Sequence, residues 1–360
     1  MSRHVAEPPL AADDDLEWCH DAVQGVSRTF ALTVEVLEEP MDSYICVGYL
    51  LCRVADTIED AGHIPPTEQA RLLELYDEVL DPETDTDATA FVEHAQEWIP
   101  DDRTPDWDVV AHTPRVMRTF SALAPDVRAA VTPPARELVQ GMAMFVDRYG
   151  ETGGLRIQSR DELEEYCYYA AGTVGNLITN LVTRGDIDSD RSQRLYDTAE
   201  EFGLLLQLVN ISKDVYDDYT EENNVYLPSE WLAEEGVPQE ELLAPEHRSG
   251  ATAVVRRTAE RARDFLDDAQ TYLETVPLVD GNTLEAWAVP YLLAVGTLRE
   301  LRANPEDALR ETDVKVSREE VFAVVSAMSG GTSTSERREL AEFREAIAHK
   351  PFHRAAPGAD

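Results

Sequence analysis

The stretch YLLCRVADTIED (residues 49–60) combines two patterns that together predict the fold of this chain. Its apolar residues recur at helical spacing, which indicates a helix packed into a protein interior. Its polar residues follow one another at spacings of four, three and four, so they share one face of that helix. They are Tyr49, Arg53, Asp56 and Asp60. A core helix does not need this polar stripe and a solvated helix does not need the leucines, so the stretch predicts a buried helix with a functional face.

Helical periodicity continues along the rest of the chain, without alternating runs strong enough to predict a strand. We therefore expect an all-α protein, with one domain over residues 15–330 because no flexible linker divides it. Residues 1–14 are predicted to be a disordered lead-in and 331–360 a C-terminal helix and tail. The acidic stretches 81–90 and 100–107 are interpreted as surface connections without a chemical role. The predicted helices are 16–25, 41–60, 66–80, 115–125, 133–149, 161–183, 190–219, 251–276, 282–303 and 317–328.

Composition limits the possible partners. The chain has 360 residues and a formal net charge of −40, which makes nucleic acid a poor partner. Lysine occurs only at Lys213, Lys315 and Lys350. An acidic surface nearly free of lysine suggests adaptation to molar intracellular salt, as in a halophile, where charges are screened over ~3 Å. A generally acidic mesophilic protein is the alternative.

The cysteines and the N-terminal sequence predict a cytoplasmic protein. Cys19, Cys46, Cys52 and Cys167 lie in apolar surroundings without metal-ligand spacing, so we expect reduced thiols. The N-terminus lacks the apolar core of a signal peptide, and no apolar run approaches the ~20 residues that span a bilayer.

A second polar stripe lies on an oily stretch, FGLLLQLVNISKDVYDDY (202–219). Its members again follow helical spacing and are Gln207, Asn210, Asp214 and Asp217 or Asp218. Lys213 adjoins this stripe as Arg53 adjoins the first. Buried carboxylates must be paired, hydrogen-bonded or bound to metal. A pair of buried ion networks without a ligand is therefore one interpretation.

The other interpretation is a site for an amphiphile. Facing carboxylate stripes above apolar side chains suit Mg²⁺, which prefers a few carboxylates together with waters and ligand phosphates. Such a site suits an amphiphile with a diphosphate head and a hydrocarbon tail. Mg²⁺ and the two cations, Arg53 and Lys213, would stabilise the diphosphate as it leaves. A dry cavity would then protect the allylic carbocation that remains from water.

With these residues in place, the chain resembles the squalene/phytoene synthase family over residues 15–330. VSRTF (26–30) is similar to the opening motif of the family. YLLCRVADTIED is similar to the first aspartate-rich motif, in the wording of squalene synthases, and QLVNISKDVYDD (207–218) to the second. YCYYAAGTVG (166–175) matches a further family motif. The resemblance implies the class I isoprenoid synthase fold, a helical bundle around a central active-site cavity.

The resemblance also implies roles for individual residues. Arg28 would contact diphosphate, while Thr29 and Phe30 would line the substrate site. Tyr166 would lie near the rearranging cation, although a buried core tyrosine is the alternative. Gly172 and Gly175 would allow either close helix packing or room for a prenyl chain. The metal positions fall on Asp56, Asp60, Asn210, Asp214 and Asp218, and the diphosphate and substrate contacts on Tyr49, Arg53, Gln207 and Lys213.

Two later segments resemble squalene synthases in particular. AWAVPYLLAVGTL (286–298) is similar to a late helix of these enzymes, and VKVSREEV (314–321) to a segment associated with the nicotinamide cofactor. This implies NADPH binding near Lys315 and Arg318, although a charged helix start is the alternative. One departure concerns the loop after the second motif. Where the family reads Gly-Arg, this chain has Asn223 and Asn224, so a cation expected to grip diphosphate is missing.

The expectation is a Mg²⁺-dependent squalene synthase that joins two farnesyl diphosphates through presqualene diphosphate and reduces the product with NADPH. We expect a monomer with at most peripheral membrane contact. The alternatives are a phytoene or dehydrosqualene synthase, which uses no reductant, and a non-catalytic helical protein that binds prenyl lipids.

Overall fold

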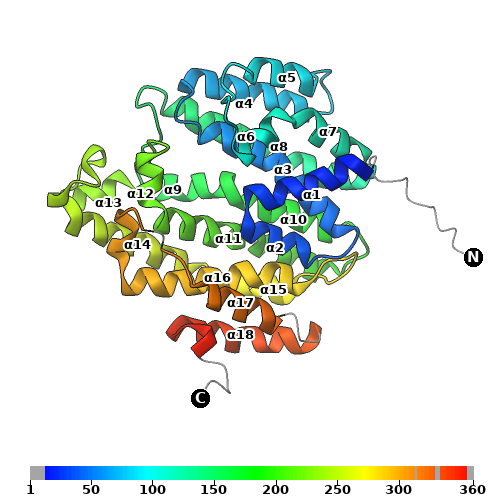
Figure 1. Cartoon of the computed structure of the whole chain (residues 1–360). Helices are drawn as coiled ribbons and strands as arrows, with labels where there is room; N and C mark the ends of the chain where they lie inside the picture. The colour runs from blue at the N-terminus through cyan, green and yellow to red at the C-terminus, as the bar shows by residue number, and fades with distance from the viewer. Residues whose placement is uncertain (1–12, 313, 329–332, 355–360) are drawn as a thin grey trace, which may run out of the picture.

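The computed structural model describes residues 13–312, 314–328 and 333–354, and these residues fold into packed helices (Figure 1). The predicted lead-in therefore lies almost wholly outside the described residues. The α-helices are α1 Asp13–Val26, α2 Arg28–Glu35, α3 Met41–Glu59, α4 Pro66–Leu80, α5 Ala88–Ala95, α6 Pro105–Ala111, α7 Thr113–Ala122, α8 Pro125–Arg148, α9 Arg160–Cys167, α10 Thr173–Val182, α11 Ser189–Lys213, α12 Val215–Thr220, α13 Ser229–Glu234, α14 Arg248–Asp264, α15 Leu266–Thr275, α16 Leu284–Ala303, α17 Arg318–Met328 and α18 Ser333–His349.

The helices are arranged in layers. In Figure 1, α4 and α5 form the top of the molecule, α3 and α8 lie below them, and α9, α10 and α11 cross the middle. Helices α14, α15 and α16 lie beneath α11, and α17 and α18 cover the bottom. Each layer packs on the next through contacts of α4 with α8, α8 with α10, α10 with α11, α11 with α16, and α16 with α18. The all-α prediction is confirmed.

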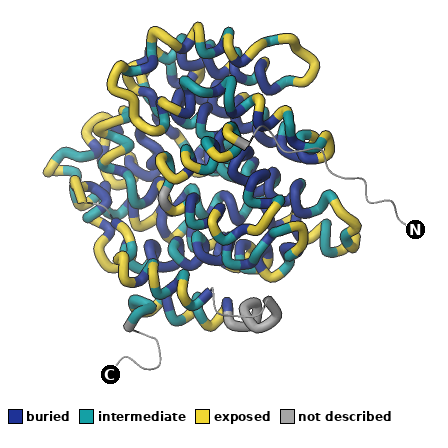
Figure 2. The backbone as a smooth tube through the Cα atoms, turned by 45° about the vertical axis from the view of Figure 1, so that its right-hand side comes forward, coloured by how far each residue is buried: buried dark blue, intermediate teal, exposed yellow. Residues whose placement is uncertain are grey.

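Helix α3 lies inside this arrangement because its apolar face is continuous. Leu50, Leu51, Val54 and Ile58 are all fully buried. The buried residues in Figure 2 likewise follow the inner turns of the tube, while the exposed ones follow its outer loops. The polar stripe lies on one side of α3, so the burial of this helix places the stripe in the protein interior. No helix of the described part of the chain combines the length and apolar character needed to cross a bilayer.

Several helix boundaries differ from those predicted. Helix α8 begins at Pro125 and not near residue 133, so Pro133 and Pro134 lie inside it. Helix α2 was missed because it has only eight residues; Ser27 caps it by accepting a hydrogen bond from the N–H of Phe30 at 3.2 Å. The stretches 81–90 and 100–107 are connections only over 81–87 and 100–104, because α5 begins at Ala88 and α6 at Pro105.

The helical motif at 166–175 is interrupted by a wider turn. Residues Tyr168–Gly172 form a π-helix between α9 and α10. π-Helical turns are rare in proteins, and those that occur are often found at functional sites. Here the turn carries Ala170 and Ala171, both of which line the central cavity.

Candidate functional site

A cavity of about 800 Å³ lies between the helices that carry the two polar stripes. This volume is within the range of small-molecule sites, which is roughly 300–1,000 Å³. The apolar part of its lining comes mainly from α3, α8, the π-helix, α10, α11 and α16. It includes Ile45, Met142, Val174, Leu177, Ile178, Phe202, Leu206, Trp287, Pro290 and Leu293.

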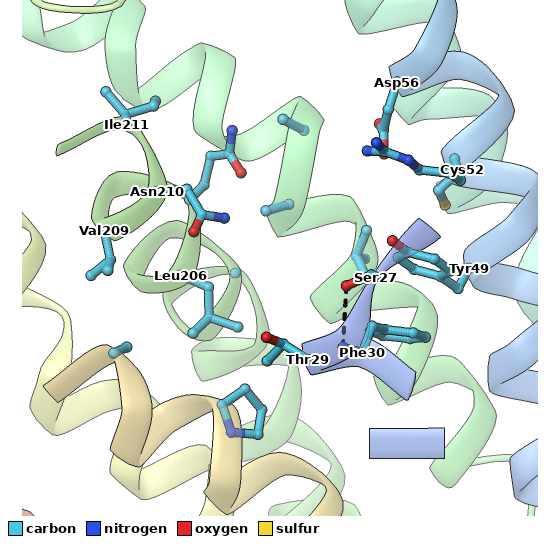
Figure 3. A pocket seen from close by; sticks show the side chains of 18 of the residues that line it. Ser27, Thr29, Phe30, Tyr49, Cys52, Asp56, Leu206, Val209, Asn210 and Ile211 are labelled. Carbon is cyan, nitrogen blue, oxygen red and sulfur yellow. Dashed lines mark hydrogen bonds and ion pairs between the residues drawn. The ribbon is translucent and has the colours of Figure 1, made fainter. Parts of the chain in front are cut away.

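The first stripe lines this cavity from α3. Tyr49, Arg53, Asp56 and Asp60 all belong to the lining. Phe30 of α2 stacks on Tyr49, with ring centroids 3.9 Å apart and planes 16° apart. Figure 3 shows this pair together with the carboxylate of Asp56. Thr29 also lines the cavity, so the opening motif and the first stripe meet there, as expected.

Arg53 joins this stripe to α6. Its Nε donates to Asp106 Oδ1 at 2.7 Å, and its Nη1 lies 3.8 Å from Asp56 Oδ2. Burial would lower the pKa of Arg53, but Asp56 and Asp106 raise it, so the guanidinium stays charged. Asp106 belongs to the stretch 100–107, in which no functional residue was predicted from the sequence.

The second stripe lines the cavity from α11 and the start of α12. Gln207, Asn210, Lys213, Asp214 and Asp218 all belong to the lining. In Figure 3, Asn210 and Asp56 lie on opposite sides of the pocket. Lys213 forms an ion pair with Asp214, which ends α11. Helical spacing left open whether Asp217 or Asp218 belongs to this stripe. Asp218 lines the cavity, and Asp217 is exposed to solvent.

The carboxylates outnumber the cations around this cavity. Among the described lining residues, six are acidic and three are cationic, and they are Asp56, Glu59, Asp60, Asp214, Asp218 and Glu222 against Arg53, Lys213 and Lys315. Burial raises the pKa of Asp56 to about 7, against the opposing effect of Arg53, and that of Glu222 to about 8, with Asp60 adding to the rise. Burial and the neighbouring Glu222 raise the pKa of Asp218 well above its usual range.

This surplus of hard oxygen ligands fits a divalent cation such as Mg²⁺. The described residues include no group of three or more His, Cys, Asp or Glu side chains gathered closely enough to enclose an ion by themselves. Mg²⁺ held in proteins by a few carboxylates completes its coordination with water or ligand phosphates. Asp56 and Asp60 on one side, with Asn210, Asp214 and Asp218 on the other, have the donor chemistry for this.

Tyr166 lies in the wall of the cavity and is almost completely buried. Its Oη lies 3.3 Å from Glu59 Oε1 and 3.2 Å from the Oη of Tyr226. Phe145 contacts its ring edge-on, with centroids 5.3 Å apart. Glu59, Glu222 and Tyr226 were not singled out from the sequence. Glu59 stands inside the DTIED motif, and that was the available signal.

Two glycines let α10 and α11 approach closely beside the cavity. A Cβ on Gly175 would lie 2.1 Å from the carbonyl oxygen of Ala199, and one on Gly203 2.2 Å from that of Ala171. For Gly175, close helix packing is therefore the supported interpretation. Gly175 and Gly203 also line the cavity.

The remaining predicted residues divide between the cavity and the surface. Lys315 lines the cavity from the segment before α17. Arg318 is exposed at the start of α17 and is not among the described lining residues. Arg28 begins α2, but its side chain lies outside the described part of the structure.

Comparison with known proteins agrees with this geometry. The sequence model described as squalene/phytoene synthase matches residues 23–320. This chain belongs to the squalene/phytoene synthase family. The family motifs at 26–30, 49–60, 166–175 and 207–218 all lie within the matched residues.

Individual relatives are distant in sequence. The Botryococcus squalene synthase of Botryococcus braunii is 25% identical over 82% of this chain and 59% of its own length. The squalene synthase of Eremothecium gossypii is 26% identical over 87% of this chain and 69% of its own, and that of Homo sapiens 23% identical over 93% and 74%. The chain thus spans less than two thirds of the length of the first of these relatives.

The fold is also shared with solved structures. A TcSQS complex with the ligand E5700 superimposes with a TM-score of 0.77 at 23% identity, covering 97% of this chain and 94% of that one. A dehydrosqualene synthase complex gives a TM-score of 0.61 at 21% identity, covering 88% and 95%. The isoprenoid synthase helical fold is confirmed.

Proposed function

We propose that this protein is a Mg²⁺-dependent prenyltransferase that joins two farnesyl diphosphates head to head and reduces the product to squalene. The observation that carries the proposal is the position of the two carboxylate stripes. They come from α3 and from α11–α12, far apart in the sequence, and they face one apolar cavity.

The diphosphate end of the site would be built from both stripes. Bound Mg²⁺ would neutralise the leaving diphosphate and act as a Lewis acid toward its oxygens. Arg53 and Lys213 would add fixed positive charge, and Asp106 would hold Arg53 in position. Gln207 and Asn210 would offer amide hydrogen bonds to the substrate end of the same stripe. Arg28 remains a proposed diphosphate contact by family resemblance.

The apolar end would hold the prenyl chains and exclude water. The C–O bond of one substrate would break, the electron pair leaving with diphosphate, and the allylic carbon would bond to the second substrate with loss of a proton. This yields presqualene diphosphate. Thr29, Phe30 and Tyr49 would contact substrate, and the ring or oxygen of Tyr166 would stabilise positive charge or accept the proton.

The position of Lys315 favours a reductive second step. Presqualene diphosphate would lose its diphosphate, and the resulting cation would rearrange and be reduced. NADPH would supply hydride. Lys315 and Arg318 are both exposed to solvent, but only Lys315 also lines the cavity. Lys315 could meet a cofactor phosphate there, while Arg318 could contact only a part of the cofactor that extends outside.

Product analysis tests this proposal. Farnesyl and geranylgeranyl diphosphates are offered separately with Mg²⁺ in molar KCl, each with and without NADPH. We expect squalene from farnesyl diphosphate with NADPH, and presqualene diphosphate without it. Phytoene from the longer substrate, indifferent to NADPH, would make the protein a phytoene synthase. Binding of either substrate without any product would favour a non-catalytic prenyl-lipid-binding protein.

A further inference from the structure

Asn224 occupies the loop position at which the family pattern has an arginine. The residue is buried, with 2% of its surface exposed. The loop runs beside residues 155–158 in a parallel, extended arrangement, with a β-bridge between Arg156 and Val225. The N–H of Val225 donates to the carbonyl of Leu155 at 2.9 Å, and the N–H of Ile157 donates to the carbonyl of Val225 at 3.1 Å. Asn224 is not among the described residues that line the cavity.

The amide of Asn224 is held at both ends. Its Oδ1 accepts from the N–H of Leu155 at 2.8 Å. Its Nδ2 donates to the Oη of Tyr226 at 3.1 Å and to Glu222 Oε2 at 3.3 Å. Because a backbone N–H can only donate, the oxygen of the amide must face Leu155 and the NH₂ must face Tyr226. The amide therefore has one possible orientation.

This orientation places a donor on the oxygen of Tyr226, which the hydroxyl of Tyr166 also contacts. The Oη of Tyr226 accepts from Asn224 Nδ2 at 3.1 Å and from the hydroxyl of Tyr166 at 3.2 Å. The hydroxyl of Tyr166 also lies 3.3 Å from Glu59 Oε1, so Tyr226 and Glu59 are the two acceptors around its proton. The hydrogen bonds thus run without a break from the Leu155 N–H through Asn224, Tyr226 and Tyr166 to the carboxyl group of Glu59.

We infer that Asn224 is a positioning residue for Tyr166 and acts on it through the hydroxyl of Tyr226. The inference rests on the proposed function in one respect, the role given to Tyr166. Asn224 holds the oxygen of Tyr226 in position, and that oxygen accepts from the hydroxyl of Tyr166, which keeps the phenol of Tyr166 in place at the cavity wall. The position that would carry a diphosphate-binding cation in the family pattern serves here to organise the tyrosine pair.

The turn at Asn223 is held by a different side chain, that of Arg156. Arg156 is buried and donates to the backbone carbonyl oxygens of Leu155 and Asn223 and to Asn223 Oδ1. Asn223 adopts φ +59°, a left-handed conformation that glycine also tolerates. Neither of these side chains is hydrogen-bonded to the tyrosine pair in the described contacts. Asn223→Gly is therefore a matched control that keeps the turn and the hydrogen bonds from Asn224 to the tyrosine pair.

Kinetics of variants test the inference. Asn224→Asp keeps an oxygen for Leu155 but replaces the donor facing Tyr226 with an acceptor. We expect kcat to fall at least tenfold while KM for farnesyl diphosphate stays within twofold. Tyr226→Phe should give a similar fall, and the double variant should be no worse than Tyr226→Phe alone. Asn223→Gly should leave both constants near wild type.

Other kinetic outcomes would overturn the inference. A raised KM with unchanged kcat in Asn224→Asp would mean that Asn224 meets the diphosphate directly, and so would a lowered KM in Asn224→Arg. Independent losses that multiply in the double variant would mean that Asn224 does not act through Tyr226. If Asn224→Asp folds poorly, an unchanged kcat in Tyr226→Phe overturns the inference by itself.

A spectroscopic readout separates this inference from the proposed reaction. Tyrosine labelled with ¹³C at Cζ reports hydrogen bonding at each hydroxyl, and Tyr166→Phe assigns the Tyr166 signal. Asn224→Asp should shift that signal and Asn223→Gly should not. An unshifted signal contradicts the inference whether or not the protein makes squalene. Conversely, if the wild-type protein makes no coupled product but Asn224→Asp still shifts the Tyr166 signal, only the proposed function is contradicted.

Discussion

Arg53 and Asp106 form an ion pair of 2.7 Å that joins the middle of α3 to the first turn of α6. The pair uses the Nε of Arg53, while its Nη1 lies 3.8 Å from Asp56 Oδ2. Asp106 thus orients the cation that the proposed mechanism assigns to diphosphate.

Replacing Asp106 should weaken substrate binding more than chemistry. We expect Asp106→Asn to raise KM for farnesyl diphosphate about three- to tenfold, because the Arg53 side chain would no longer be held in one position. Asp108→Asn is the matched control, since Asp108 is an exposed residue of the same helix and lies 3.6 Å from Arg103. Steady-state kinetics measure both. Equal effects of the two substitutions would remove Asp106 from the site.

Replacing Asp214 should abolish turnover without unfolding the protein. Asn keeps the shape of the side chain but not its charge, so we expect Asp214→Asn to lower kcat at least 100-fold with an unchanged helical circular dichroism spectrum. Asp217→Asn should remain active because Asp217 is exposed on the adjacent turn. Substantial turnover in Asp214→Asn would rule out its assignment as a metal ligand.

Gly175→Ala should destabilise the fold because its Cβ would lie 2.1 Å from the carbonyl oxygen of Ala199. Helices α10 and α11 would have to separate, at a cost of roughly 2 kcal/mol in the free energy of unfolding. The control is Gly185→Ala, since a Cβ there meets no atom within 4 Å. Thermal melting compares the two. A Gly175→Ala variant as stable as Gly185→Ala would mean that the helices are not in such close contact.

Glu320 should stabilise α17 in a pH-dependent way. It is 1% exposed, and Arg299 donates to both of its oxygens at 2.8 Å. Burial alone would raise the pKa of Glu320, but Arg299 and the N–H of Phe352 lower it below its usual value of 4.5. A carboxyl with a lowered folded pKa stabilises the protein above pH 4.5, and this stabilisation is lost as the pH falls through the folded pKa.

Glu320→Gln should therefore lower the free energy of unfolding by about 3 kcal/mol at pH 7. The difference from wild type should shrink as the pH falls below 4.5. Denaturant unfolding at several pH values measures it, with the exposed Glu97→Gln as control. A difference that stays constant down to pH 3 would contradict the ion-pair explanation.

The sequence allowed the fold class and much of the polar lining of the cavity to be predicted for a physical reason. A polar stripe on an apolar helix has a period that can be counted, and each stripe is local to one helix. The stripe from Tyr49 to Asp60 and the stripe from Gln207 to Asp218 were found in this way, and both line the cavity.

The contacts between helices could not be predicted from the sequence. Asp106 lies 53 residues from Arg53, and Tyr226 lies 60 residues from Tyr166, so only the packed fold brings them together. Asn224 illustrates the same limit, because its identity indicated a lost cation while its burial and its contact with Tyr226 indicate a different use. Helix α6 was missed for a local reason, since its seven residues follow an acidic, proline-containing stretch.

The most direct test of the central claim is the thermal stability of the protein in molar KCl with a non-hydrolysable farnesyl thiodiphosphate, measured with and without Mg²⁺. If the two carboxylate stripes form a metal-dependent diphosphate site, the analogue should raise Tm by several degrees only when Mg²⁺ is present. Asp60→Asn and Asp214→Asn should each abolish that rise, and Asp217→Asn should retain it. A rise that is equal without Mg²⁺, or that survives in both stripe variants, would contradict the account.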